Sequence, residues 1–317
     1  MASLMNNHLM IFSGSSHPQL AEEIANYLNV KLGDIKLSRF SCGEIYARIK
    51  DNVRGRSTFV IQTGSEKVNE DLMELFIIID ALKRASADNI TAVIPHFSYA
   101  RQDKKSASRE PISARLIADL LTKSGIDRII TMDLHSDQIQ GFFDVPVDHL
   151  TAIPLLASYI NDKNLVNPVV IAPDTGRAKT AKKIADRINA PLAILHKTRP
   201  EHNKTAITHI VGDVKGKTCI FVDDMVDTAG TATSGVDTLM ANGANKEIYM
   251  VATHGILSGP AVEKFLKAGM KEVVFTNSVP IPDSKKFPGL KILSAASLLG
   301  EAIKRAYENQ SISSLFD

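Results

Sequence analysis

Short apolar runs alternate with amphipathic stretches along the whole chain. The apolar runs have the length and β-rich composition of buried strands. They predict strands over Leu9–Phe12, Phe59–Gln62, Ala92–Pro95, Ile129–Met132, Val169–Ala172, Cys219–Val222, Ile248–Ala252 and Val273–Thr276. The stretches between them predict helices over Gln19–Leu28, Leu72–Ala85, Ser113–Ser124, Ala178–Ile188, Gly235–Asn242 and Pro260–Ala268. This alternation is typical of an α/β protein with mainly parallel sheets flanked by helices on both faces.

A break near Asp148–Pro154 divides the pattern into two halves with a similar order of strands and helices. A chain of 317 residues is long enough for two domains, each with its own core. We therefore expect an N-terminal domain over residues 1–150 and a C-terminal domain over residues 151–317. We expect the extreme C-terminus to pack back on the first domain.

The charge of the chain is nearly balanced, with 37 basic and 35 acidic residues and a formal net charge of +2. Proteins that grip nucleic acid or a membrane surface by general electrostatics carry a larger positive excess. The chain has no Trp and 6% aromatic residues, which disfavours a stacking platform for single strands. We therefore expect no nucleic acid and no membrane among the partners, and any phosphate binding must be local.

The cysteines and the first residues bear on the compartment. Cys42 and Cys219 are the only cysteines and lie far apart in the sequence, which favours a reducing compartment over a disulfide framework. Residues 1–12 contain no Lys or Arg and only a short apolar run, unlike a signal peptide. The sequence therefore predicts a cytoplasmic protein.

Polar residues follow the predicted strands at the positions where an α/β sheet builds its ligand site. Ligands of open α/β sheets bind beyond the carboxyl ends of the strands. Four strands end in Arg, His, Asp or Gly–Thr turns, at His96–Lys105, Asp133–His135, Pro173–Gly176 and Asp223–Thr231. These segments predict a site assembled from both halves of the chain.

The segment Val222–Thr231 carries the strongest signal. Paired carboxylates, Asp223 and Asp224, are followed by a small-residue loop that opens a helix near Ala232, and a helix N-terminus cradles a phosphate well. Carboxylates repel a phosphate, so the pair would accept hydrogen bonds from a sugar diol or hold a cation. The structural alternative is a capped helix after a buried strand, with solvated acids.

The other segments can also be explained without a functional role. A His and an Asp at a strand end, as in Asp133-Leu134-His135, suit a divalent metal, although a single His is more often structural. The basic loop around Arg101 suits phosphates or a base, but such loops are usually solvated faces. His196–Thr205 is predicted to be a mobile polar loop, and an ordinary basic surface loop is the simplest interpretation of it.

Two of these segments resemble known family motifs. Val222–Thr231 resembles the 5-phosphoribosyl-diphosphate motif of the phosphoribosyltransferase fold, and Asp133–Asp148 resembles the signature of ribose-phosphate pyrophosphokinases. The resemblance runs from about Met10 to Phe316. It implies two phosphoribosyltransferase-like domains. It also implies transfer of the β,γ-diphosphoryl group of ATP to the C1 hydroxyl of ribose 5-phosphate, giving 5-phosphoribosyl 1-diphosphate and AMP.

The resemblance also implies roles for single residues. The ATP-binding residues would be Phe40, Cys42, Glu44, Arg101 and Gln102. The residues of the ribose 5-phosphate site would be Arg199, Asp223, Asp224, Asp227, Thr228, Ala229, Gly230 and Thr231. The cofactor Mg²⁺ would be held by His135 and Asp174, with Asp133 a weaker candidate for a second cation, and the catalytic loop cations would be Lys197 and Arg199.

The resemblance places the chain with the phosphate-activated, ADP-inhibited class, which assembles as hexamers. Inorganic phosphate and ADP are therefore expected effectors, and a homo-oligomer, a hexamer, is the expected assembly. The allosteric site would draw on Arg54, Ser86, Gln140, Asp148, Ser311, Ser313 and Phe316.

Three positions depart from the family pattern. Cys42 replaces an Asp or Asn that helps to read the adenine amino group, so we expect looser nucleotide selectivity. Arg177 stands where a Gly commonly follows Gly176, and Ser106 replaces a charged residue.

Two other functions stay open: a salvage phosphoribosyltransferase, and a non-catalytic regulatory homologue.

Overall fold

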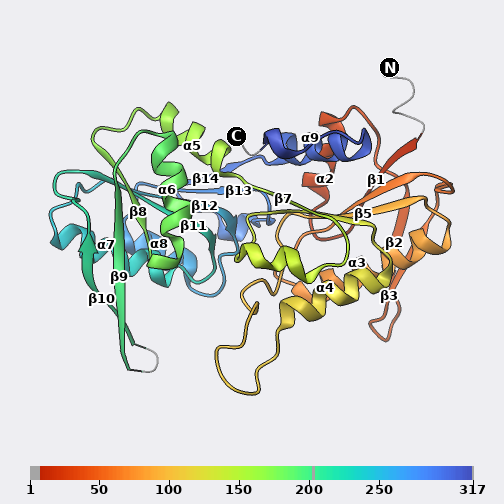
Figure 1. Ribbon diagram of the computed structural model, residues 1–317, viewed down its shortest axis with the longest axis horizontal. Helices are drawn as coiled ribbons and strands as arrows, with labels where there is room; N and C mark the ends of the chain where they lie inside the picture. Colours follow the sequence, from red (N-terminus) through yellow and green to blue (C-terminus); the bar gives the residue numbers. More distant parts are fainter. Residues whose placement is uncertain (1–7, 202–203, 316–317) are drawn as a thin grey trace. The chain divides into compact units, whose positions relative to one another are not determined.

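The chain folds into two compact units, each built on its own sheet (Figure 1). The computed structural model describes the backbone of residues 8–201 and 204–315, and the side chains of these residues except 197–208. The first unit holds the chain up to Thr151, Ser278–Pro280 and the segment from Ser294 onward. The second unit holds Ala152–Asn277 and Ile281–Leu293.

The sheet of the first unit is parallel throughout. Its strands lie in the order β1 (Leu9–Ser13), β4 (Ser57–Ile61), β5 (Asn89–Ile94), β6 (Arg128–Met132) and β7 (Val147–Leu150). Because the strands are buried on both faces, their sequences are nearly continuous apolar runs rather than alternating ones. Their carboxyl ends therefore meet at one edge of this sheet.

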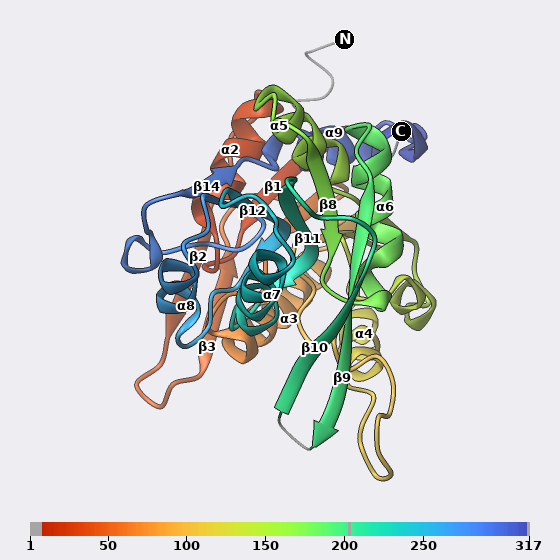
Figure 2. The same cartoon turned by 90° about the vertical axis from the view of Figure 1, so that its left-hand side faces the viewer.

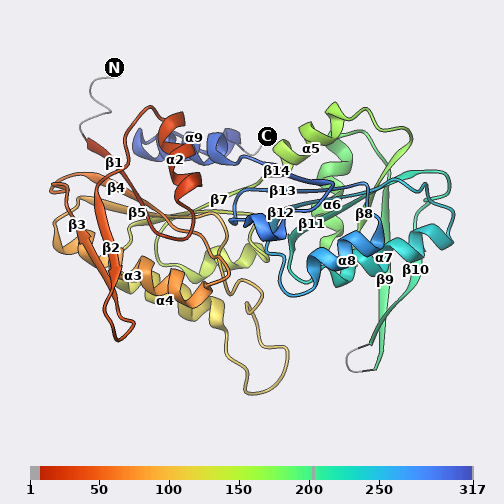
Figure 3. The ribbon, with the colours of Figure 1, turned by 180° about the vertical axis from the view of Figure 1, so that it is seen from behind.

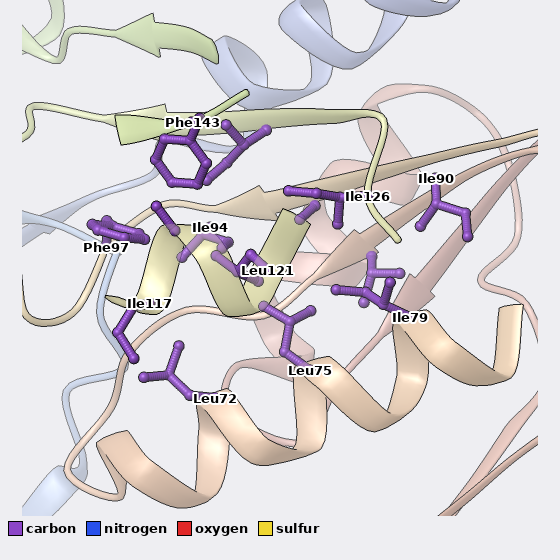
Figure 4. Close-up of a cluster of buried hydrophobic side chains, with 14 of the residues drawn as sticks. Leu72, Leu75, Ile79, Ile90, Ile94, Phe97, Ile117, Leu121, Ile126 and Phe143 are labelled. Carbon is purple, nitrogen blue, oxygen red and sulfur yellow. The ribbon is translucent and has the colours of Figure 1, made fainter. Parts of the chain in front are cut away.

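Helices cover both faces of this sheet (Figure 3). On one face, α3 (Val68–Arg84) packs on α4 (Ser113–Ser124), and on the other α2 (Pro18–Tyr27) packs on α9 (Ala296–Tyr307). Helix α3 buries a stripe at helical spacing, which includes Leu72, Leu75 and Ile79. Figure 4 shows this stripe packed with Leu121 of α4 against Ile94 and neighbouring apolar side chains.

An antiparallel hairpin stands apart from the parallel sheet of the first unit. Its strands are β2 (Ile35–Arg39) and β3 (Ile45–Ile49), paired from Ile35↔Ile49 to Arg39↔Ile45. Gly43 has a φ of 96°, which a side chain would make costly, and its N–H donates to the Phe40 carbonyl at 2.8 Å. The tip therefore carries Phe40 to Glu44 in a fixed turn.

The second unit contains a larger sheet. Its order is β10 (Lys204–Val211), β9 (Leu192–Glu201), β8 (Pro168–Ala172), β11 (Thr218–Val226), β12 (Ile248–Gly255), β13 (Glu272–Thr276) and β14 (Leu290–Leu293). Its helices are α5 (Ile153–Asp162), α6 (Ala178–Arg187), α7 (Gly230–Ala241) and α8 (Ala261–Ala268). Within this unit α5 packs on α6 and α7 on α8. A core that includes Phe221, Leu239 and Phe265 lies under α7 and α8.

The prediction of a loop over His196–Thr205 is wrong. Strand β9 continues to Glu201 and pairs antiparallel with β10, from Ile194↔Val211 to Glu201↔Lys204 (Figure 2). A ladder is held by backbone hydrogen bonds, so a polar sequence on an edge strand does not prevent it from forming. The hydrophobic pattern failed here because the sequence from His196 to Thr205 is mostly polar.

Several element bounds also differ from the prediction. Strand β11 does not stop at Val222 but runs to Val226, because β12 continues to pair with it as far as Val226↔Gly255. Helix α7 begins at Gly230 rather than Gly235. No helix in the described part of the chain is long and apolar enough to span a membrane.

Candidate active site

The first candidate residue of the second unit, Asp174, lies directly after β8. Its carboxylate accepts a hydrogen bond from the backbone N–H of Arg177 at 3.2 Å, which closes the short 3₁₀ turn Thr175–Arg177. Backbone from Asp174 is extended, with φ −161° and ψ 174°. This bond orients the Asp174 carboxyl group at the carboxyl end of its strand.

Asp223 and Asp224 lie on the final part of β11, where that strand has lost one neighbour. Strand β8 pairs with β11 only over Thr218–Phe221, whereas β12 pairs beyond it. The guanidinium of Arg177 binds both carboxylates, with Nε 3.3 Å from Asp223 Oδ1 and Nη2 3.2 Å from Asp224 Oδ2. The backbone N–H of Asp224 also donates to Asp223 Oδ1 at 2.9 Å. The structure thus joins two residues expected in the site with a third that the site was not expected to contain.

The electrostatics of this pair are those of two crowded acids. Asp224 is only 5% exposed. Burial raises the pKa of Asp223 well above its ordinary value, the adjacent Asp224 carboxyl raises it further, and the Arg177 guanidinium opposes the rise. Because the two acids titrate together, proton uptake belongs to the pair rather than to either residue.

The loop from Asp227 to Thr231 leads into the N-terminus of α7. Its backbone is fixed from outside, since the Ser258 N–H donates to the Asp227 carbonyl at 2.9 Å and Lys264 Nζ to the Thr228 carbonyl at 3.0 Å. Ala229 has φ 58° and ψ 4°, a left-handed conformation that is unusual for a residue with a Cβ atom. The N-cap residue, Ala229, has no side chain that could cap the helix, and the first N–H groups of a helix are suited to bind an anion.

The metal candidates of the first unit lie in the turn after β6. Asp133 has a φ of 36°, its N–H donates to the Leu150 carbonyl at 2.9 Å, and the Thr151 hydroxyl donates to its Oδ1 at 2.7 Å. The next residue, Leu134, donates its N–H to His149 Nε2 at 2.8 Å. This strained, cross-linked turn presents His135, which is partly exposed.

The donor set suits Mg²⁺ only in part. Carboxylate oxygens are the ligands that Mg²⁺ prefers, and this ion keeps several waters and phosphate oxygens beside one or two protein groups. Asp174 fits that requirement. Within the described part of the chain, no three His, Cys, Asp or Glu side chains gather to hold a metal. The arrangement fits an ion that is bound together with substrate phosphates rather than one held in a protein cage.

The ATP candidates of the hairpin lie at its tip. Phe40 is 55% exposed and packs edge-on against Tyr46, with ring centroids 5.7 Å apart. Its backbone N–H donates to the Glu44 carbonyl at 2.9 Å, and Cys42 and Glu44 are both exposed. An exposed aromatic ring beside a carboxylate has the chemistry to stack on and bind a purine.

Arg101 and Gln102 follow β5 in an exposed turn. The N–H of Gln102 donates to the carbonyl of Tyr99, a residue with φ 65°, and Ser113 Oγ donates to Gln102 Oε1 at 2.6 Å. Further on, the N–H groups of Ser106 and Ala107 donate to Glu110 Oε2 at 2.7 and 2.8 Å. The turn is therefore internally braced and leaves the Arg101 side chain exposed.

The two catalytic candidates, Lys197 and Arg199, lie on β9, where Lys197 pairs with Ile207 of β10. Their side chains fall outside the part of the chain whose side chains the structure describes. Their role therefore stays a prediction.

The regulatory candidates lie in three parts of the first unit. The Gly55 N–H, next to Arg54, donates to the Ser86 carbonyl at 3.0 Å, so these two candidates are neighbours. Gln140 contacts His149 Nδ1 at 3.3 Å, and the neighbouring Asp148 forms an ion pair with Arg128 at 2.7 Å. Ser311 and Ser313 are joined by a hydrogen bond of 3.3 Å. Phe316 lies outside the described residues.

Sequence reasoning missed two residues of the site. Arg177 was noted only as added charge near Asp174, and its pairing with both acids has no local sequence signal, because it depends on where β8 ends. His149 was not singled out. Its position one strand away from Leu134 follows from the pairing of β6 with β7, which places Thr131 opposite His149.

The chain matches known proteins of one family over nearly its whole length. Residues 9–125 match the family model of the N-terminal domain of ribose phosphate pyrophosphokinase, and residues 198–317 match the phosphoribosyl synthetase-associated domain. The ribose-phosphate pyrophosphokinase of Caldanaerobacter subterraneus is 52% identical, covering 98% of each chain. That of Bacillus subtilis is 50% identical, covering 98% of each chain.

A solved structure agrees as well. The phosphoribosylpyrophosphate synthetase of Mycobacterium smegmatis superposes with a TM-score of 0.90 at 48% identity, covering 96% of this chain and 100% of that one. The fold and the site define an α/β protein of the phosphoribosyltransferase-like class, with parallel sheets flanked by helices. The expected fold class is therefore confirmed. The full-length identities go further: the chain belongs to the ribose-phosphate pyrophosphokinase family.

Proposed function

We propose that the chain is a ribose-phosphate diphosphokinase that transfers the β,γ-diphosphoryl group of ATP to the C1 hydroxyl of ribose 5-phosphate. The observation that carries this proposal is that the oriented carboxyl groups of Asp223 and Asp224 and the N-terminus of α7 follow each other at the end of β11 in one unit. Relatives that are about half identical over the full length and carry this activity in their names support it. They do not favour a salvage transferase or a non-catalytic homologue.

The phosphate and the sugar hydroxyls of ribose 5-phosphate would bind to different groups of the protein. The Asp227–Thr231 loop would take the 5′-phosphate, because helix N–H groups and the positive end of the helix dipole favour an anion. Asp223 and Asp224 would accept hydrogen bonds from the ribose hydroxyls. Those two contacts would fix the sugar and leave the C1 hydroxyl directed at the β-phosphorus.

ATP would bind through the hairpin and the turn after β5. Phe40 would stack on the base, Glu44 would accept from it, and Arg101 and Gln102 would bind the nucleotide. Mg²⁺, on Asp174 and His135 with Asp133 secondary, would neutralise phosphate charge. Lys197 and Arg199 would stabilise the charge that develops on the transferring group, so the protein works by positioning and electrostatics.

Assembly, regulation and location are part of the same proposal. A homo-hexamer and regulation by inorganic phosphate and ADP, through Arg54, Ser86, Gln140, Asp148, Ser311, Ser313 and Phe316, rest on the family resemblance. A cytoplasmic location is supported by the two unpaired cysteines, Cys42 and Cys219.

The test of this function is AMP formation from ATP, Mg²⁺ and ribose 5-phosphate, measured with and without inorganic phosphate. We expect AMP release that depends on the sugar and is stimulated by phosphate. Asp223→Asn, which keeps the shape of the side chain and removes its charge, should reduce this release through weaker sugar binding. A folded wild-type protein that releases no AMP under either condition would exclude the function.

A further inference from the structure

Arg177 makes an unusual pair of contacts for a residue in a turn. Its side chain is only 15% exposed, and it contacts Asp223 and Asp224 at once through two nitrogen atoms. Neighbouring residues of a strand normally direct their side chains to opposite faces. A single planar guanidinium joins them here because β8 ends early and leaves the side of β11 open to the turn that follows it.

Two groups of the protein contact the same oxygen atom of Asp223, Oδ1. Oδ1 of Asp223 accepts from both Arg177 Nε and the Asp224 N–H. These two contacts on one oxygen atom fix the torsion angle of the carboxyl group. Asp223 is therefore held in one orientation through its Oδ1 atom.

The charge balance makes Arg177 necessary. Two ionised carboxylates in contact, one of them almost completely buried, repel each other and favour uptake of a proton or a cation. An Arg side chain stays protonated at every physiological pH and so supplies a permanent positive charge. When both acids are ionised, Arg177 lowers the charge of the cluster from −2 to −1.

Resting on the proposed ribose 5-phosphate site, we propose that Arg177 is a positioning residue that holds the carboxyl groups of Asp223 and Asp224 in the orientation that the sugar hydroxyls need. It supplies the countercharge that a divalent cation would otherwise bring to this pair. Arg177 keeps these contacts while the sugar is bound. The opposite role, a side chain that blocks the acids until substrate displaces it, predicts the reverse kinetics.

The variant Arg177→Gln tests the proposal because it removes the charge but keeps the backbone N–H that donates to Asp174. We expect the KM for ribose 5-phosphate to rise at least about tenfold, as for a lost hydrogen bond to a charged group, with a much smaller change in kcat. Arg177→Lys, which keeps the charge but not the fork, should fall between the two. Arg84→Gln, which removes an exposed Arg paired with Asp80 on α3, is the matched control and should leave KM unchanged.

Manganese binding gives a readout that does not depend on turnover. Electron paramagnetic resonance of the full-length protein without nucleotide should show one more bound Mn²⁺ per chain in Arg177→Gln than in the wild type. Adding Asp223→Asn to that variant should remove the extra ion. Thermal unfolding of each variant shows that the comparison is made between folded proteins.

These experiments distinguish failure of the role proposed for Arg177 from failure of the proposed enzymatic function. An unchanged or lowered KM in Arg177→Gln, or the absence of the extra Mn²⁺, would overturn the role of Arg177. If Arg177→Gln does not fold, Arg177→Lys decides by the KM alone: a raised KM supports the role and an unchanged KM overturns it. If the wild type releases no sugar-dependent AMP, the proposed function fails, and the Mn²⁺ comparison still tests the countercharge.

Discussion

The imidazole of His149 accepts a hydrogen bond from the backbone N–H of Leu134 through Nε2, at 2.8 Å. This bond ties β7 to the turn that carries Asp133 and His135. Because an accepting nitrogen carries no proton, a neutral ring has its proton on Nδ1, which lies 3.7 Å from the Asp137 carboxylate. His149 is thus placed to orient a proposed metal-binding turn without itself being a ligand.

His149→Ala should therefore loosen that turn and weaken the proposed metal site. Loss of a partner that orients ligands typically lowers metal affinity by about 10- to 100-fold, so we expect a similar rise in the Mg²⁺ concentration for half-maximal activity. His149→Gln, which retains an acceptor, should lie closer to the wild type. An Mg²⁺ titration of activity that is identical in all three proteins would exclude this role.

Ala229 offers a test of the phosphate loop. At φ 58° a residue with a Cβ atom costs roughly 1–2 kcal/mol, and a β-branched residue costs more. Ala229→Val should therefore lower the free energy of unfolding and raise the KM for ribose 5-phosphate, whereas Ala229→Gly should change stability by less than about 1 kcal/mol. Denaturant unfolding and steady-state kinetics check both, and equal behaviour of the two variants would argue against strain at this position.

Lys197 should contribute to turnover rather than to nucleotide binding. If it stabilises charge that develops on the transferring group, Lys197→Ala should reduce kcat by several orders of magnitude and leave ATP affinity nearly unchanged. The exposed Lys246 provides a matched control, and Lys246→Ala should be silent. An unchanged rate for Lys197→Ala would remove this residue from the catalytic set.

The two cysteines should differ in reactivity. Cys42 is exposed at the hairpin tip, whereas burial raises the pKa of the Cys219 thiol to about 12. A thiol reagent should therefore modify only Cys42 of the two in the native protein, and ATP should slow that reaction if its base binds at the hairpin as proposed. Reaction that ATP does not slow would place the nucleotide elsewhere.

Glu301 should contribute to stability in a pH-dependent way. The hydrogen bond and ion pair from Arg305, at 2.8 Å, lower the pKa of Glu301 in the folded state below its ordinary value. Its contribution is therefore present above the unfolded-state pKa, about 4.3, and is lost as pH falls through the lower folded-state value. Glu301→Gln should melt at a lower temperature than the wild type at about pH 6. The difference in melting temperature between the two proteins should shrink as the pH is lowered to about 3. A gap that stays constant with pH would contradict the linkage.

The sequence predicted the parallel strands and the loops that follow them, because buried strands leave continuous apolar runs and ligand sites lie at strand ends. It placed Asp223, Asp224 and Asp227–Thr231 in one site, and the structure brings them together in one unit. It could not predict the end of β11 or the ladder of β9 with β10. The end of β11 and the β9–β10 ladder both depend on backbone pairing with a neighbouring strand. Such pairing leaves no signal in the hydrophobic pattern of the sequence.

Arg177 illustrates the same limit for the site. Its charge was visible in the sequence, but its partners depend on β8 being shorter than β11, which only the register of the two strands determines. The adenine and regulatory residues came from the family resemblance, since a lone Phe40 or Ser311 carries no chemical signal of its own. Physical reasoning alone would have left them as surface residues.

The most direct test of the central claim follows the β-phosphorus of ATP. The wild-type enzyme is incubated with ribose 5-phosphate, Mg²⁺ and ATP labelled at the β-phosphorus, and the products are separated. The account predicts that the label moves to the sugar diphosphate and that the nucleotide product is unlabelled AMP. Label retained in ADP would show transfer of a single phosphoryl group and would contradict it.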